Sequence, residues 1–385
     1  MAKLGDVFTL IRNGASIKQT EGAGGFPITR IETIANREVD RNKFGYANIV
    51  DIAKYESYIL QDGDILMSHI NSEKHLGKVA LYKKQANEQI IHGMNLLLLR
   101  ANPKILLPAY AAYYFETPAF LWQVQRITKK SVNQASFTVT ALKEVEIPLP
   151  SLDTQRRIAA ILDKVTDLIA QRRAQLDKLD LLVKSRFVEM FGEENKYTTA
   201  EKACNTIVDC PHSTPRYTGQ DKIYPSIRTS EIKNGQIDWT TMLYVDIEEY
   251  ESRTKRLKPM PGDIVYAREG TYGDCVILPE HHKFCLGQRT MLFRPDYSIC
   301  TSEYLHQALR SNAVKRQADE SNAGSTVPHV NVADAKKFTF PLPPLAKQKT
   351  FSVTMQKTNQ IKNHINRSLE WLEVLKKSLM QQYFE

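Results

Sequence analysis

Ile147-Pro148-Leu149-Pro150-Ser151-Leu152-Asp153-Thr154-Gln155 stands near the middle of this 385-residue chain, and Phe340-Pro341-Leu342-Pro343-Pro344-Leu345-Ala346-Lys347-Gln348 stands near its end. The two stretches share Pro-Leu-Pro, then Leu, then Gln, at a spacing of 341 − 148 = 193 residues. Proline disfavours a helix before it, so each stretch predicts a rigid exit from a globular unit into a helix. Repeats of about 20–50 residues indicate a solenoid, whereas one this long indicates a duplicated domain.

The segments before the two helices predict the same order of strands. Short apolar runs bounded by Gly, Asn and Asp indicate strands in both segments. In the first segment the predicted strands are 26–31, 63–68, 77–82 and 95–100, with a helix at 109–125. In the second they are 224–228, 262–266, 275–278 and 289–294. We therefore expect an α+β protein with a first domain at 1–150, a helix at 151–195, a second domain at 196–343 and a helix at 344–385.

Apolar residues recur at seven-residue intervals in both helical segments. Leu162, Ile169, Leu176 and Val183 form one such row. A sustained heptad predicts a coiled-coil partner. We expect the two helices of one chain to pack on each other, and pairing between two copies of the chain is the alternative. The predicted interface residues are Ile158, Leu162, Val165, Ile169, Leu176, Leu179, Val183, Met190, Ile361, Ile365, Leu372, Leu375 and Leu379.

Composition limits the function further. The net charge of +9 favours a nucleic-acid partner, because a phosphate backbone is the commonest reason for such an excess. No run approaches the roughly 18 apolar residues that span a bilayer, and the first residues lack the apolar core of a signal peptide, so we expect a cytoplasmic protein. The five cysteines all lie in the second half without a Cys-x-x-Cys pair, which favours reduced thiols.

Catalytic motifs are missing or weak. The chain has no Asn/Asp-Pro-Pro-aromatic turn of a DNA methyltransferase, no phosphate-binding glycine loop and no His-Glu-x-x-His. The remaining candidates are of the kind that arise by chance: Asp296 with Asp334 and Lys336 for a nuclease, His281, His282, Cys275 and Cys285 for zinc, and Cys210 with His212 for a nucleophile. We expect no catalytic residue and no metal in this chain, which favours a recognition module.

The Pro-Leu-Pro-x-Leu-x-x-Gln stretches, the helices after them and the duplicated half resemble the specificity subunits of type I restriction–modification systems. Three further stretches resemble target-recognition sequences of that family: 209–215, 286–290 and 324–329. The resemblance covers essentially the whole chain. In the second copy, Lys349-Thr350 replaces the basic pair that follows Gln155.

This resemblance implies two α/β target recognition domains related by a pseudo-two-fold repeat, each reading one half of a bipartite asymmetric site in double-stranded DNA. It also implies an antiparallel coiled coil that sets the spacer and docks two methyltransferase subunits. S-adenosylmethionine, ATP and Mg²⁺ would belong to the methyltransferase and restriction subunits, and no cofactor to this chain. The alternatives are a self-contained DNA methyltransferase or nuclease with an unrecognised site, and a basic coiled-coil assembly scaffold.

Loops on a strand scaffold usually carry DNA contacts, with arginine reading guanine and Asn or Gln reading adenine. In the first domain the predicted DNA-binding residues are Arg30, Ser68, His69, Asn71, Lys74, Lys129, Lys130, Asn133 and Gln134. In the second they are Arg228, Arg268, Glu269, Tyr272, Gln288, Arg289, Ser325, Thr326 and His329. We expect Lys129 and Lys130 to meet phosphate.

Overall fold

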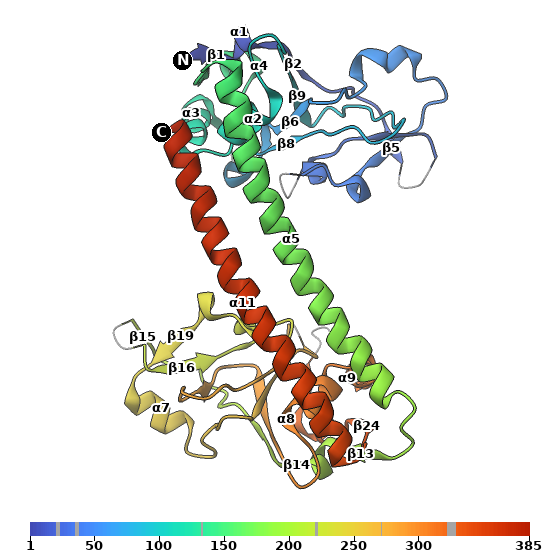
Figure 1. Ribbon diagram of the computed structural model, residues 1–385, viewed down its shortest axis with the longest axis vertical. Coiled ribbons are helices and arrows are strands. Elements are labelled where there is room, and N and C mark those ends of the chain that lie inside the picture. Colours follow the sequence, from blue (N-terminus) through green and yellow to red (C-terminus); the bar gives the residue numbers. More distant parts are fainter. Residues whose placement is uncertain (21–23, 35–37, 132–133, 220–221, 271, 322–328) are drawn as a thin grey trace. The chain divides into compact units, whose positions relative to one another are not determined.

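The structure is a computed structural model that describes residues 1–20, 24–34, 38–131, 134–219, 222–270, 272–321 and 329–385. The chain divides into two compact units, 1–173 with 367–385, and 174–366 (Figure 1). Two 40-residue helices, α5 (Leu152–Phe191) and α11 (Leu345–Phe384), each contribute to both units. The predicted helical segments therefore exist, but each is shared between units.

A four-stranded antiparallel sheet forms the centre of each unit. In the first unit its order is β2 (Phe8–Asn13), β9 (Leu96–Ala101), β6 (Ile65–Ser68) and β8 (Val79–Leu81). In the second it is β14 (Cys204–Asp209), β23 (Thr290–Pro295), β20 (Ile264–Ala267) and β21 (Cys275–Ile277). The registers match, down to a bulge in the edge strands β2 and β14. The predicted strands that belong to these sheets are confirmed, whereas β2 and β14 were not predicted.

A second, smaller sheet flanks each central sheet. In the first unit it is β3 (Gln19–Thr20), β5 (Gly45–Ala47) and β4 (Phe26–Ile28). In the second it is β15 (Tyr217–Thr218), β19 (Leu243–Val245), β16 (Tyr224–Ile227) and β22 (Cys285–Leu286). The remaining short pairs join β1 (Ala2–Lys3) to β12 (Glu146–Ile147), β13 (Tyr197–Thr199) to β24 (Thr339–Pro341), and β17 (Ile232–Lys233) to β18 (Gln236–Ile237).

Short helices cover the sheets. In the first unit they are α1 (Leu4–Val7), α2 (Pro108–Tyr114), α3 (Pro118–Ile127) and α4 (Val139–Lys143). In the second they are α6 (Ala200–Ala203), α7 (Ile247–Arg253), α8 (Ser302–Leu309), α9 (Asn312–Ser321) and α10 (Val332–Lys337). The single helix predicted at 109–125 is wrong: Pro118 disfavours a helical Thr117, which instead caps α3 by accepting a hydrogen bond from the Phe120 amide.

Both long helices belong to the core of each unit. In the first unit, Ile158 and Leu162 of α5 and Phe384 of α11 join a cluster with sheet residues such as Met67 and Leu97. In the second unit, Phe187 and Phe191 of α5 each make an edge-to-face contact with Phe351 of α11 at 5.6 Å between ring centroids. Burial of these apolar side chains is what attaches the sheets to the helices.

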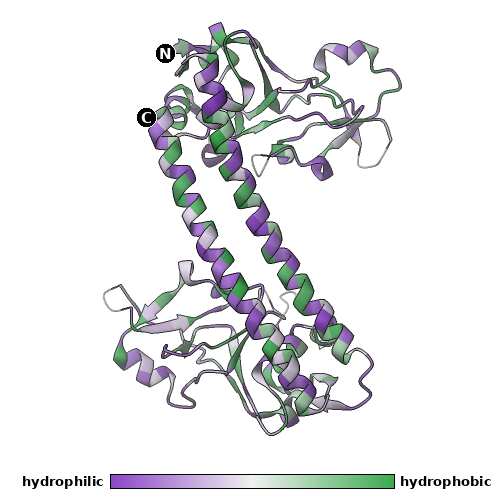
Figure 2. Ribbon diagram, in the orientation of Figure 1, coloured by the Kyte–Doolittle hydropathy of each residue, from purple (hydrophilic) through white to green (hydrophobic). Residues whose placement is uncertain are grey.

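Helices α5 and α11 are antiparallel within each unit. In the second unit Asp180 pairs with Lys362, and Phe187, further along α5, contacts Phe351, earlier in α11. In the first unit Arg173 pairs with Glu373 at 2.9 Å. The helices of one chain therefore pack on each other, and Figure 2 shows apolar and polar residues alternating along both. No helix of the described residues is long and apolar enough to cross a membrane.

Two predicted interface residues are corrected. Ile361 is 49% exposed and Leu375 is 45% exposed, so both face away from the helix pair, while the other predicted residues are buried or half-buried. The buried row of α11 instead includes Thr358 and Lys362. Hydrophobicity alone did not place Lys362 in the helix interface, because lysine is charged. The residue is nevertheless buried, since its ammonium pairs with the Asp180 carboxylate.

The glutamine of each Pro-Leu-Pro stretch locks the helix to its domain. Gln155 is fully buried, accepts a hydrogen bond from the Leu107 amide at 2.8 Å, and donates to the carbonyls of Ile105 and Pro150, each at 2.9 Å. Gln348 makes the same three bonds, accepting from the Thr301 amide and donating to two carbonyls, those of Ile299 and Pro343. The repeated motif is therefore a repeated joint.

Candidate nucleic-acid interface

In the first unit, a three-stranded sheet gathers two groups of predicted DNA contacts that lie far apart in sequence. Strand β11 (Ala135–Ser136) pairs with both β10 (Lys129–Lys130) and β7 (Ile70–Asn71). Asn71 and Lys130 therefore flank the same residue of β11. Lys129, Lys130, Lys74 and Gln134 are exposed there, and Lys130 forms a solvent-exposed ion pair with Glu73 at 2.9 Å. Such an exposed pair is weak, so this lysine remains available to phosphate.

In the second unit, Glu269 unites the predicted contacts. Its carboxylate accepts from His329 Nδ1 at 2.9 Å and pairs with Arg289 Nε at 3.0 Å. Gln288 donates to the Thr214 hydroxyl at 3.0 Å, and the hydroxyl of Tyr272 donates to an Asp319 carboxylate oxygen. Glu269, Arg289 and His329, which lie far apart in the sequence, thus meet at one place.

Arg289 has an uncommon backbone conformation. Its φ of 65° lies in the left-handed region, which costs energy for a residue other than glycine. The Arg289 carbonyl accepts a hydrogen bond from the Arg268 amide at 3.0 Å, which holds the turn in place. The guanidinium remains largely exposed.

Three predicted contacts need correction, because Ser68, His69 and Arg268 are buried. Arg268 pairs with Asp209 and donates to His329 Nε2 at 2.5 Å, so it positions these segments from inside the domain. Burial lowers the pKa of His69 to about 4, which keeps the imidazole neutral.

Arg30 and Arg228 are half-buried and occupy matching places after β4 and β16. Arg30 Nε donates to Gln19 Oε1 at 2.5 Å. Arg228 forms a two-pronged ion pair with the buried Glu231, at 3.0 and 2.5 Å. These bonds hold Arg30 against β3 and Arg228 against the turn that contains Glu231. Asn133, Ser325 and Thr326 lie outside the described residues.

Sequence reasoning missed a basic cleft in the second unit. This cleft of 370 Å³ is lined by Pro211 and His212 on one side and by Lys255 and Arg256 on the other. Arg253 is buried and donates to the carbonyls of Pro211, Ser213 and Leu286, which fixes the loop that carries His212. The run Arg253-Thr254-Lys255-Arg256, which begins at the last residue of α7, was the available signal.

The described residues do not support the zinc, nucleophile and nuclease candidates of the sequence. No group of three His, Cys, Asp or Glu among them could hold a metal. All five cysteines are buried, and burial raises the pKa of the Cys210 thiol and that of Cys285, the latter to about 11. A protonated thiol is a poor nucleophile. Asp334 accepts from Asn331 beside the start of α10, a capping arrangement.

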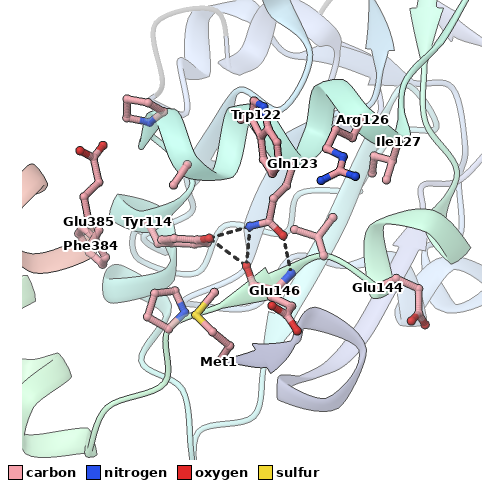
Figure 3. Close-up of a pocket in the computed structure, with 14 residues that line it drawn as sticks. Met1, Tyr114, Trp122, Gln123, Arg126, Ile127, Glu144, Glu146, Phe384 and Glu385 are labelled. Carbon is pink, nitrogen blue, oxygen red and sulfur yellow. Dashed lines mark hydrogen bonds between the residues drawn. The ribbon is translucent and has the colours of Figure 1, made fainter.

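A groove of 890 Å³ lies in the first unit and is lined by Trp122 and Gln123 of α3 and by Phe384 of α11 (Figure 3). Its polar groups are bonded to one another: Gln123 donates to the Tyr114 hydroxyl at 2.9 Å and to the Glu146 carbonyl, and accepts from the Glu146 amide. Gln317 makes the same exchange with Thr339 in the second unit. We therefore read this feature as domain packing.

Comparison with known proteins gives matches in both halves of the repeat. A family model described as the type I restriction modification DNA specificity domain matches residues 1–179 and 218–371, one stretch in each half of the chain. The chain belongs to this family. It is similar to the putative type I restriction enzyme MjaX specificity subunit of Methanocaldococcus jannaschii, with 30% identity over 98% of this chain and 91% of the relative.

Two further specificity subunits are more distant. The EcoKI specificity subunit of Escherichia coli is 28% identical over 43% of this chain and 34% of its own length. The crystal structure of the S subunit of a type I restriction–modification system from M. genitalium matches with a TM-score of 0.62 at 14% identity, covering 100% of this chain and 95% of that one. The latter shows a shared fold.

Proposed function

We propose that this chain is the DNA-reading subunit of a type I restriction–modification complex, in which each unit reads one half of a bipartite asymmetric site. The observation that carries the proposal is one frame bearing two different surfaces. The central sheets share their register and their joints, yet the first unit presents Asn71 and exposed lysines, whereas the second presents Glu269 paired with Arg289. Two readers that differ in this way suit two different half-sites.

Charge supports the choice of partner. The excess of +9 suits a polyanion, and the exposed Lys129, Lys130, Lys255 and Arg256 offer it phosphate contacts. S-adenosylmethionine, ATP and Mg²⁺ would then act in partner subunits, with the complex working on DNA in the cytoplasm.

The helices suit a ruler. At about 1.5 Å per residue, 40 residues give an unbroken helix of roughly 60 Å. Since each helix contributes residues to both units without interruption, its length would set the spacer between the two half-sites.

Repeated exposed apolar residues on the helices suit two copies of one partner. Leu168, Leu181 and Leu182 of α5 are exposed, and so are the residues 193 positions later in α11, which are Ile361, Val374 and Leu375. Exposed apolar groups of this kind mark protein contacts. Two equivalent sets on one chain would dock two methyltransferase subunits.

The test is to express this chain with its methyltransferase subunit in a host and map methylated bases across the genome. We expect one bipartite asymmetric motif with a fixed spacer. Methylation or cleavage by the purified chain alone would favour the self-contained enzyme, and equal binding to every duplex would favour the assembly scaffold.

A further inference from the structure

A tight turn precedes β9 in the first unit and β23 in the second. The last residue pair between β6 and β9 is Ser68 with Leu96, and the last between β20 and β23 is Ala267 with Thr290. Asn95 and Arg289 are therefore the residues just before the strand at the same register. The predicted contacts include Gln288 and Arg289 but nothing from the matching turn of the first unit.

The two turns are also fixed in the same way by a neighbouring strand. In the first unit Ile91 pairs in parallel with Ile28 of β4. In the second unit Cys285 and Leu286 pair in parallel with β16. Each turn then begins with a glycine, at a position where a residue with a side chain would collide with the neighbouring backbone. A Cβ on Gly93 would lie 2.2 Å from the Thr29 carbonyl oxygen, and one on Gly287 would lie 2.8 Å from that of Ile227. The two residues after each glycine are the part of the turn that can vary.

Met94 and Asn95 occupy those two places in the first unit. Met94 is 49% exposed and Asn95 is exposed. Neither side chain has a hydrogen-bond partner among the described residues. The turn lies beside the three-stranded sheet that contains Lys129 and Lys130. Ser68 pairs with Leu96, so His69 is the next residue opposite Asn95, and it leads directly into β7 of that sheet.

We propose that Met94 and Asn95 determine specificity in the first unit, at the position where the second unit uses Gln288 and Arg289. This inference rests on the proposed function. Asparagine bonds both N6 and N7 of adenine, and a methionine can contact the methyl group of thymine, whereas arginine bonds O6 and N7 of guanine. The first half-site would thus require an A·T pair where the second requires a G·C pair.

The test uses the complex of the full chain with its methyltransferase subunits and duplexes carrying the site mapped in the host, each with one base pair changed. We expect Asn95→Ala to lose discrimination of about 5- to 150-fold at one A·T pair of one half-site. Arg289→Ala should do the same at one G·C pair of the other half-site. Asn87→Ala, an exposed asparagine in another turn of the first unit, is the matched control.

The isosteric Asn95→Asp gives a second readout, since a carboxylate accepts from cytosine N4 and should move the preference at that pair away from adenine. Unchanged discrimination in the Asn95 variants, or an equal loss of affinity for every duplex, overturns the inference. If the wild-type complex prefers no bipartite duplex, the proposed function itself fails.

Discussion

Replacing Gln155 by leucine should weaken the joint between the first domain and α5. The substitution keeps the side-chain size but removes one acceptor and two donors, leaving the Leu107 amide and the carbonyls of Ile105 and Pro150 without partners. At about 1 kcal/mol for each of these partly buried groups, the loss is about 3 kcal/mol.

That loss converts into a melting temperature. The first unit contains 173 + 19 = 192 residues, and a domain of this size loses about 2–4 °C per kcal/mol. We therefore expect Gln155→Leu to lower the midpoint of the first unit by about 6–12 °C in calorimetry. Gln348→Leu should do the same to the second unit, because it removes the same three bonds.

The control is Gln171→Leu, which changes an exposed glutamine of the same helix. Hydrogen exchange at the Leu107 amide should accelerate in Gln155→Leu and stay as it is in the control. A Gln155→Leu protein that melts within 2 °C or so of the control would refute the idea that the motif is a joint.

Lys255→Ala should weaken binding to all duplexes alike and reduce the slope of log affinity against log salt by about 1, and an unchanged slope would exclude a phosphate contact. His69 has a folded pKa of about 4, below its unfolded value of 6.5, so its contribution is present above pH 6.5 and lost as pH falls toward 4. Between pH 7 and 5 the loss of this contribution lowers the free energy of unfolding of the native protein by about 2 kcal/mol. His69→Phe should therefore reduce the fall in melting temperature over that range. Leu181→Ser and Val374→Ser should each remove one of two bound methyltransferase subunits in native mass spectrometry, whereas Val188→Ser, whose repeat counterpart is polar, should remove neither. Inserting one heptad in both helices should lengthen the spacer of the methylated motif, and a fixed spacer would show that the helices are no ruler.

Much of the frame could be predicted because it repeats. The Pro-Leu-Pro stretches located both helices, and the strands from Gly63 and Gly262 were found twice because turn glycines and apolar runs are local signals. The edge strand β2 was not predicted because its burial does not alternate along the strand: Phe8 and Ile11 are buried, whereas Leu10 between them is half-buried.

The site was harder to predict because exposure is a tertiary property. Arg268 and Arg289 have the same side chain, yet one is buried against Asp209 and the other extends from a strained turn. Likewise, nothing local distinguishes buried Lys362 from its exposed neighbours on α11 until the position of Asp180 is known. Alignment of the two halves at Gly93 and Gly287 is the sequence signal that singles out Met94 and Asn95, the residues proposed above.

The sharing of α11 between units has a consequence for synthesis on the ribosome. Leu379, Met380 and Phe384 pack in the core of the first unit, although residues 174–366 are made before them. At about 5–20 residues per second, those 366 − 173 = 193 residues take roughly 10–40 seconds. During that time Ile158 and Leu162 lack part of their cover, so the amino-terminal reader is the last part of the protein that can be completed. A nonsense mutation before Leu379 would therefore damage the first unit, although most of that unit is synthesised earlier.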